Sequence, residues 1–220
     1  MRFPKACSGV KKIRSAEILS VIAGLFAVVT LMIGLFTLTS VEPDRGLILG
    51  VGTAALVFII CGGVLLLVAF ILKLIGTVCA GKEESAFKTA MIFMIIGFVT
   101  EAITYIPNLS PRIQAIMGFV GVIAEASALA AVMYIILGVQ RLAGRCERVD
   151  MVKKGNTVMK LVLMVGIFVL LADTVSAVFK LLRTHAIVSG VFAVAAAALS
   201  IVAYIIYLGY LTQAKRMLEE

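Results

Sequence analysis

The sequence predicts an all-α integral membrane protein with six transmembrane helices. Hydrophobic residues make up 62% of the 220 residues, and charged residues make up 15%, whereas soluble domains carry about 25% charge. The mean hydropathy is +1.15. Apolar runs of roughly eighteen residues or more recur along the chain, and runs of that length cross a bilayer as helices. The chain therefore forms one membrane domain and leaves no room for a second, soluble one.

The predicted spans are residues 17–39, 47–72, 87–106, 113–139, 157–179 and 186–211. The first follows a basic N-terminal segment, but it is longer than the roughly 7–15 apolar residues of a signal peptide, so we expect it to be retained. The second contains Gly62 and Gly63. The third and fourth flank the connection 107–111, which begins and ends with proline. The fifth is followed after a short basic connection by the sixth, which is rich in alanine.

Short connections after spans one, three and five indicate antiparallel neighbours, because a short link leaves two helices side by side. We therefore expect three helical hairpins, at residues 17–80, 86–145 and 154–212. Together they form a six-helix domain at 17–212. A basic N-terminal segment, 1–16, precedes this domain, and a C-terminal tail, 213–220, follows it.

The hairpins share glycines at similar positions, which suggests an internal repeat. These glycines are Gly24, Gly97 and Gly166 in the odd spans and Gly76, Gly138 and Gly209 at the ends of the even spans. A period of roughly seventy residues predicts a parallel repeat about an axis along the membrane normal. The alternative is chance, because apolar helices draw on a small set of residue types.

Basic residues predict the orientation. Of the 20 Lys and Arg residues, all except Arg45, Arg112, Lys180 and Arg183 fall on the side that carries both termini. The positive-inside rule places that side in the cytoplasm. We therefore expect a multi-pass protein of the cell membrane, compatible with a bacterial inner membrane. The net charge of +8 is explained by topology and by attraction to anionic lipids, and no soluble basic domain is present to bind nucleic acid.

Cofactor and enzyme signatures are missing from the sequence. The four cysteines form no CxxC pair and there is one histidine, so we expect no zinc, haem or iron–sulfur site. There is no HExxH motif, nucleophile elbow or Walker motif. The sequence predicts a protein that is not an enzyme and binds no cofactor or metal.

Three acids fall inside predicted spans and are the candidate functional residues: Glu101, Glu125 and Asp173. A charged carboxylate among lipid chains costs several kcal/mol, so such residues usually face a cavity, a partner or a proton path. All three lie in the predicted outer half of the membrane or at its midplane. The polar residues proposed to accompany them in a ligand-binding site are Thr104, Ser127 and Thr174.

Two carboxylates in one pocket repel each other, and a bound proton or cation relieves that repulsion. The sequence therefore favours a small transporter or membrane solute-binding subunit. Its ligand would be cationic, amine-bearing or proton-coupled, and held in an outward-facing cavity. The alternative for Glu101 and Asp173 is a shallow position, with pairing to Arg112, Lys180 or Arg183.

A second function also fits this sequence. The chain would be a non-catalytic assembly, interaction or regulatory subunit, whose acids are paired where its helices pack against a larger membrane partner. Under either hypothesis the expected partners are membrane lipids, and a second copy of the chain is a further candidate partner.

Overall fold

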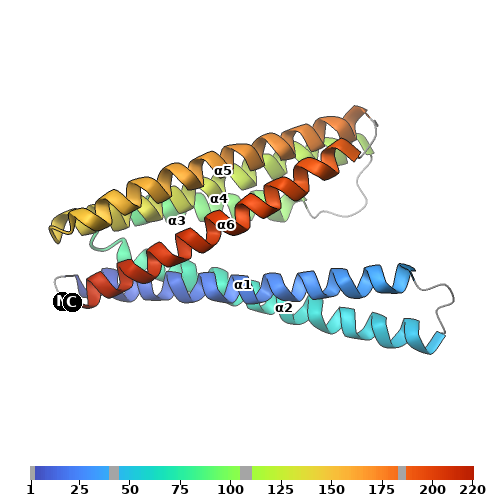
Figure 1. The fold of residues 1–220 in the computed structure, drawn as a ribbon, viewed down its shortest axis with the longest axis horizontal. Coiled ribbons are helices and arrows are strands. Elements are labelled where there is room, and N and C mark those ends of the chain that lie inside the picture. The colour runs from blue at the N-terminus through green and yellow to red at the C-terminus, as the bar shows by residue number, and fades with distance from the viewer. Residues whose placement is uncertain (1–2, 40–44, 105–110, 183–186) are drawn as a thin grey trace. The chain divides into compact units, whose positions relative to one another are not determined.

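The computed structural model describes residues 3–39, 45–104, 111–182 and 187–220, and all regular secondary structure in these ranges is helical. Figure 1 shows the helices in chain order. They are α1 (Pro4–Thr39), α2 (Arg45–Ala80), α3 (Ser85–Thr104), α4 (Pro111–Arg145), α5 (Val149–Leu182) and α6 (Ile187–Glu219).

Each of these six helices contains a segment long and apolar enough to cross a membrane. The predicted all-α architecture with six apolar helices is therefore confirmed. The orientation of the termini and the repeat relation between the hairpins stay predictions.

The helices extend beyond the predicted spans. α1 already begins at Pro4 and α6 ends at Glu219, so helix continues into the terminal segments 1–16 and 213–220. Proline suits the first turn of a helix because its missing N–H would have no partner there. Between α4 and α5 only residues 146–148 are non-helical. The basic stretch 141–154 is therefore mostly helical. A helix needs only about twenty apolar residues to span the hydrocarbon, and polar residues can extend it beyond that length.

The chain divides into two compact units, and each is described by itself. The smaller unit comprises residues 11–76 and holds most of α1 and α2. A side chain at Gly62 of α2 would lie 3.6 Å from Cβ of Phe26 on α1, and the rings of Phe26 and Phe58 are 5.6 Å apart. Lys73 Nζ lies 2.6 Å from Oε1 of Glu17, which is almost fully buried. These contacts join α1 and α2 as a hairpin.

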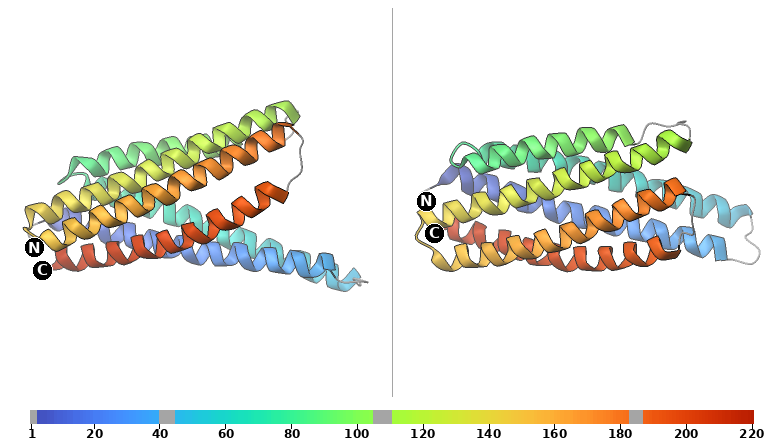
Figure 2. Two further views of the ribbon diagram at one scale, coloured as in Figure 1. Left: turned by 45° about the horizontal axis from the view of Figure 1, so that its top comes forward. Right: turned by 90° about the horizontal axis from the view of Figure 1, so that it is seen from above.

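The larger unit comprises residues 1–10 and 77–220. In it, α4 packs against both α3 and α5, and α6 packs mainly against α5. Figure 2 shows α3, α4 and α5 running side by side in alternating directions. We call the end of this unit that carries Phe3, the 81–84 turn, the 146–148 turn and Glu220 the termini end.

Glycines fix the register of the larger unit. A Cβ at Gly97 of α3 would lie 3.5 Å from Cβ of Ser127 on α4, and one at Gly138 of α4 would meet the Phe87 ring. A Cβ at Gly166 of α5 would overlap the Leu129 side chain on α4. Small residues let helices approach closely in lipid, where packing holds them together. These contacts therefore define how far α3, α4 and α5 are shifted relative to one another along their axes.

The α4–α5 turn ends α4 in a Schellman motif. Arg148 N donates to Ala143 O at 3.0 Å, and Glu147 N donates to Gly144 O at 3.1 Å. The motif requires a left-handed residue, which is usually glycine. Here Glu147 occupies that position with a φ of 58°.

The most deeply buried residues of the larger unit gather towards the termini end, whereas much of the mid-helix surface is apolar and exposed. Fully buried side chains include Val10, Phe87, Ile135, Ile136, Val139, Leu142 and Leu211. Exposed ones include Ile95, Phe98, Ile123, Leu171 and Ile201. In a membrane protein such a surface is compatible with lipid rather than with water.

Candidate functional site

The three predicted acids come from three adjacent helices of the larger unit: Glu101 from α3, Glu125 from α4 and Asp173 from α5. The antiparallel register places them at one level. With Gly97 next to Ser127, Glu101 lies opposite about residue 123 of α4, at 1.5 Å of rise per residue. With Gly166 next to Leu129, Asp173 lies opposite about residue 122. Glu125 is within about one helical turn of both.

Glu125 and Asp173 share the α4–α5 side of the larger unit. Glu125 is four residues before Leu129, and Asp173 is seven residues after Gly166. These spacings return to the same helix face. Leu129 and Gly166 are in contact. Glu125 and Asp173 therefore lie on the same side of their helices as that contact, further along the boundary between α4 and α5.

Electrostatic repulsion couples Glu125 to each of the other two acids. Glu125 experiences the negative charge of Asp173 most strongly and that of Glu101 second. Glu125 and Glu101 are exposed in the structure, and Asp173 is partly exposed. The side chains of Arg112 and Lys180, and the whole of Arg183, lie outside the described part of the structure, so the alternative pairing stays a prediction.

The accompanying polar residues lie in different places. The hydroxyl of Thr104 donates to the carbonyl oxygen of Glu101 at 2.6 Å, and that of Thr174 donates to Leu170 O at 2.7 Å. Each hydroxyl donates its hydrogen to a backbone carbonyl of its own helix, and its oxygen can still accept a hydrogen bond. Ser127 is buried on the α3–α4 contact beside Gly97. It is two residues from Glu125, on the other side of α4.

The acids do not form a chelating cluster. Among the described residues, no three His, Cys, Asp or Glu side chains are grouped so that they could hold a metal ion. Glu125 lies close enough to Asp173 and to Glu101 for the charge of each to act on it.

No protein-family model, curated protein or solved structure matches the chain. Its function must therefore be inferred from its own residues.

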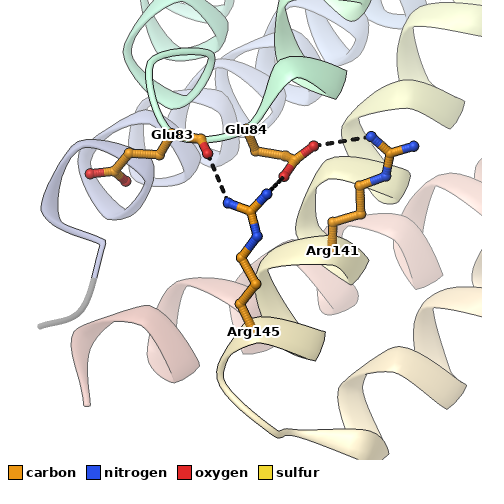
Figure 3. Close-up of polar contacts among 4 residues, drawn as sticks. All are labelled: Glu83, Glu84, Arg141 and Arg145. Atoms are coloured by element: carbon orange, nitrogen blue, oxygen red, sulfur yellow. Dashed lines mark hydrogen bonds and ion pairs between the residues drawn. The ribbon is translucent and has the colours of Figure 1, made fainter.

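A second polar cluster lies at the termini end and was not predicted from the sequence. The Glu84 side chain is 2% exposed, and it faces two arginines of α4. Arg141 Nη1 lies 3.1 Å from Oε1 of Glu84, and Arg145 Nη2 lies 2.8 Å from Oε2 (Figure 3). Arg145 also donates to the backbone carbonyl of Glu83 at 3.1 Å. The 81–84 turn is thereby attached to α4.

The Glu83 carboxylate caps the first turn of α1. Its oxygens accept hydrogen bonds from Lys5 N at 3.2 Å and Ala6 N at 2.6 Å. Free N–H groups and the helix dipole make a helix N-terminus favourable for a carboxylate. The sequence shows two adjacent acids, Glu83 and Glu84, between two apolar segments. Their spacing could not reveal that one of them caps a helix almost eighty residues away.

Proposed function

We propose that this chain is a small multi-pass membrane transporter or membrane solute-binding subunit that handles a proton or a small amine-bearing cation. Glu125 is the central residue of the site, with Asp173 and Glu101 beside it. The observation that carries the proposal is the meeting of three acids from three helices at one level of the larger unit.

The physical reason is the energy of like charges among apolar side chains. Each ionised carboxylate in this region costs energy, and its neighbours add repulsion. A proton or a cation removes both costs at once. Occupancy of the site would therefore change the local charge, and the movement of helices against each other could be coupled to that change.

Charge movement in proteoliposomes tests the proposal. The full chain is reconstituted, adsorbed on a solid-supported membrane and exposed to a pH step or a methylammonium step. We expect a transient current from the wild-type protein with at least one of the two. Glu125→Gln keeps the shape of the side chain but removes its charge, and should abolish that current.

Glu219→Gln is the matched control, since it makes the same chemical change at the exposed end of α6. It should retain the wild-type current. Equal currents from the wild type and Glu125→Gln would rule out Glu125 as the binding residue. The amount of folded protein, measured by gel filtration, separates loss of function from loss of structure.

The exposure of Glu101 and Glu125 supports a second candidate function. Acids on an open face of apolar helices can be covered by a basic or polar residue from a membrane partner. The chain would then be an assembly or regulatory subunit. In that case no step evokes a current, and Glu125→Gln changes the mass of the complex isolated from native membranes.

A further inference from the structure

A groove separates the surfaces of α5 and α6 near the termini end. Its volume is about 390 Å³, and its walls include Lys153, Lys154 and Thr157 from α5 and Ile206, Gly209 and Gln213 from α6. All of these residues belong to the larger unit. The groove is far along the helices from the three acids, so its occupant is independent of the proposed function.

One part of the groove is basic and polar. Lys153, Lys154 and Thr157 are exposed there. Lys154 Nζ donates to Oε1 of Gln213 across the groove at 3.0 Å. Neither lysine forms an ion pair with a carboxylate among the described residues. Two adjacent ammonium groups without a carboxylate partner are complementary to a phosphate.

The other part of the groove is apolar. Val158 is buried at its wall, and Ile206 is 38% exposed. A Cβ built on Gly209 would have no heavy atom within 4 Å, so the surface of α6 is notched at this point. The notch leaves room along α6 for an alkyl chain.

The basic part lies where the apolar segments end. On α5, Lys153, Lys154 and Lys160 all precede the long apolar run, and on α6 the apolar run ends shortly before Gln213. In a membrane protein this is the level of the lipid headgroups. Basic pockets between transmembrane helices at this level are suited to anionic headgroups.

We propose that the groove binds one anionic phospholipid. Its phosphate lies against Lys153 and Lys154, and one acyl chain follows the apolar wall across Gly209. A free phosphate would use only the lysines, whereas a phospholipid uses both parts of the groove.

Native mass spectrometry of the full chain tests this proposal. The protein is transferred from micelles that contain phosphatidylglycerol or phosphatidylcholine with identical acyl chains. We expect a first phosphatidylglycerol to bind more tightly than a first phosphatidylcholine. Each lysine near an anionic lipid contributes about 1 kcal/mol, so the double variant Lys153→Gln, Lys154→Gln should bind phosphatidylglycerol about thirty-fold more weakly.

A matched double variant removes the same charge elsewhere. Lys5→Gln, Lys11→Gln changes two exposed lysines of α1 and should leave the first binding step within about threefold of the wild type, since only general attraction to anionic lipid is lost. An equal loss in both double variants would overturn the proposal. So would equal binding of the two lipids by the wild type.

Gly209→Leu tests the apolar part without touching a charge. A Cβ at Gly209 would meet no atom within 4 Å, and leucine favours helix, so the variant should fold while its side chain extends into the notch. We expect weaker binding of phosphatidylglycerol. Unchanged binding would refute the acyl-chain position, and displacement of phosphatidylglycerol by equimolar inorganic phosphate would assign the groove to a free anion instead.

Discussion

Gly138 is the residue at which a single methyl group should most clearly disturb the larger unit. A Cβ there would lie 2.7 Å from Cε2 of Phe87, and 2.9 Å from both Cδ2 and Cζ. Carbon atoms in optimal contact are about 3.5–4.0 Å apart. The ring is fully buried between α3 and α4, so it cannot move aside without displacing its neighbours.

The magnitude follows from comparison with Gly121 on the same helix, where an added Cβ would meet no atom within 4 Å. Both Gly→Ala changes gain about 1 kcal/mol in helix propensity. Only Gly138→Ala also overpacks the interior, which costs about 1–3 kcal/mol. The propensity gain cancels in the comparison, so Gly138→Ala should be about 1–3 kcal/mol less stable than Gly121→Ala.

Equilibrium unfolding in mixed micelles of a mild detergent and dodecyl sulfate, followed by far-UV circular dichroism, measures this difference. Phe87→Ala removes the ring that causes the clash, so Gly138→Ala should lose its steric penalty in that background, as expected for residues in contact. Equal stabilities of Gly138→Ala and Gly121→Ala would refute the α3–α4 register. Persistence of the penalty without the ring would do the same.

Three further changes can be measured by the same unfolding experiment. Glu147→Gly should raise the free energy of unfolding by about 1 kcal/mol, because it removes a side chain from a left-handed position; a decrease would show that the carboxylate has an essential contact. Glu84→Gln should lower the free energy of unfolding by about 1–2 kcal/mol. The loss is moderate because Arg141 and Arg145 are half exposed and can be hydrated once the ion pair is lost. An unchanged free energy would show that these ion pairs do not stabilise the fold. Tyr210→Phe should change the free energy of unfolding by less than about 1 kcal/mol, because the buried hydroxyl has no hydrogen-bond partner within the described ranges; a large loss would reveal one.

The all-helical class, with six apolar helices long enough to span a membrane, could be predicted because it depends on long apolar runs, and these are properties of the chain itself. Helix ends were harder to place. α4 continues to Arg145 and α5 begins at Val149, although the apolar runs stop well before those residues. Hydropathy predicts which part of a helix can lie among lipid chains. The end of α4 is set instead by its backbone hydrogen bonds and by the turn at Glu147.

The sequence identified Glu101, Glu125 and Asp173 because an acid among apolar residues is conspicuous, and its spacing from a glycine indicates a helix face. It could not set the distances between them. The distances between the acids depend on where Gly97 and Gly166 contact α4. Such contacts form between residues that are distant in the chain. Ser127 is a different case, because its spacing of two residues from Glu125 already puts it on another face of α4. The structure adds that this face meets α3 beside Gly97.

By itself the sequence determined the number of helices, their apolar character and the presence of three acids within them, because each of these is written in local composition. Only the tertiary structure decided that Glu83 caps α1, that Glu84 meets two arginines, and that the lysines of α5 face a notch at Gly209 on α6. The physical reason is that hydrogen bonds, ion pairs and grooves act over a few ångströms in space, and their partners are brought together only by packing.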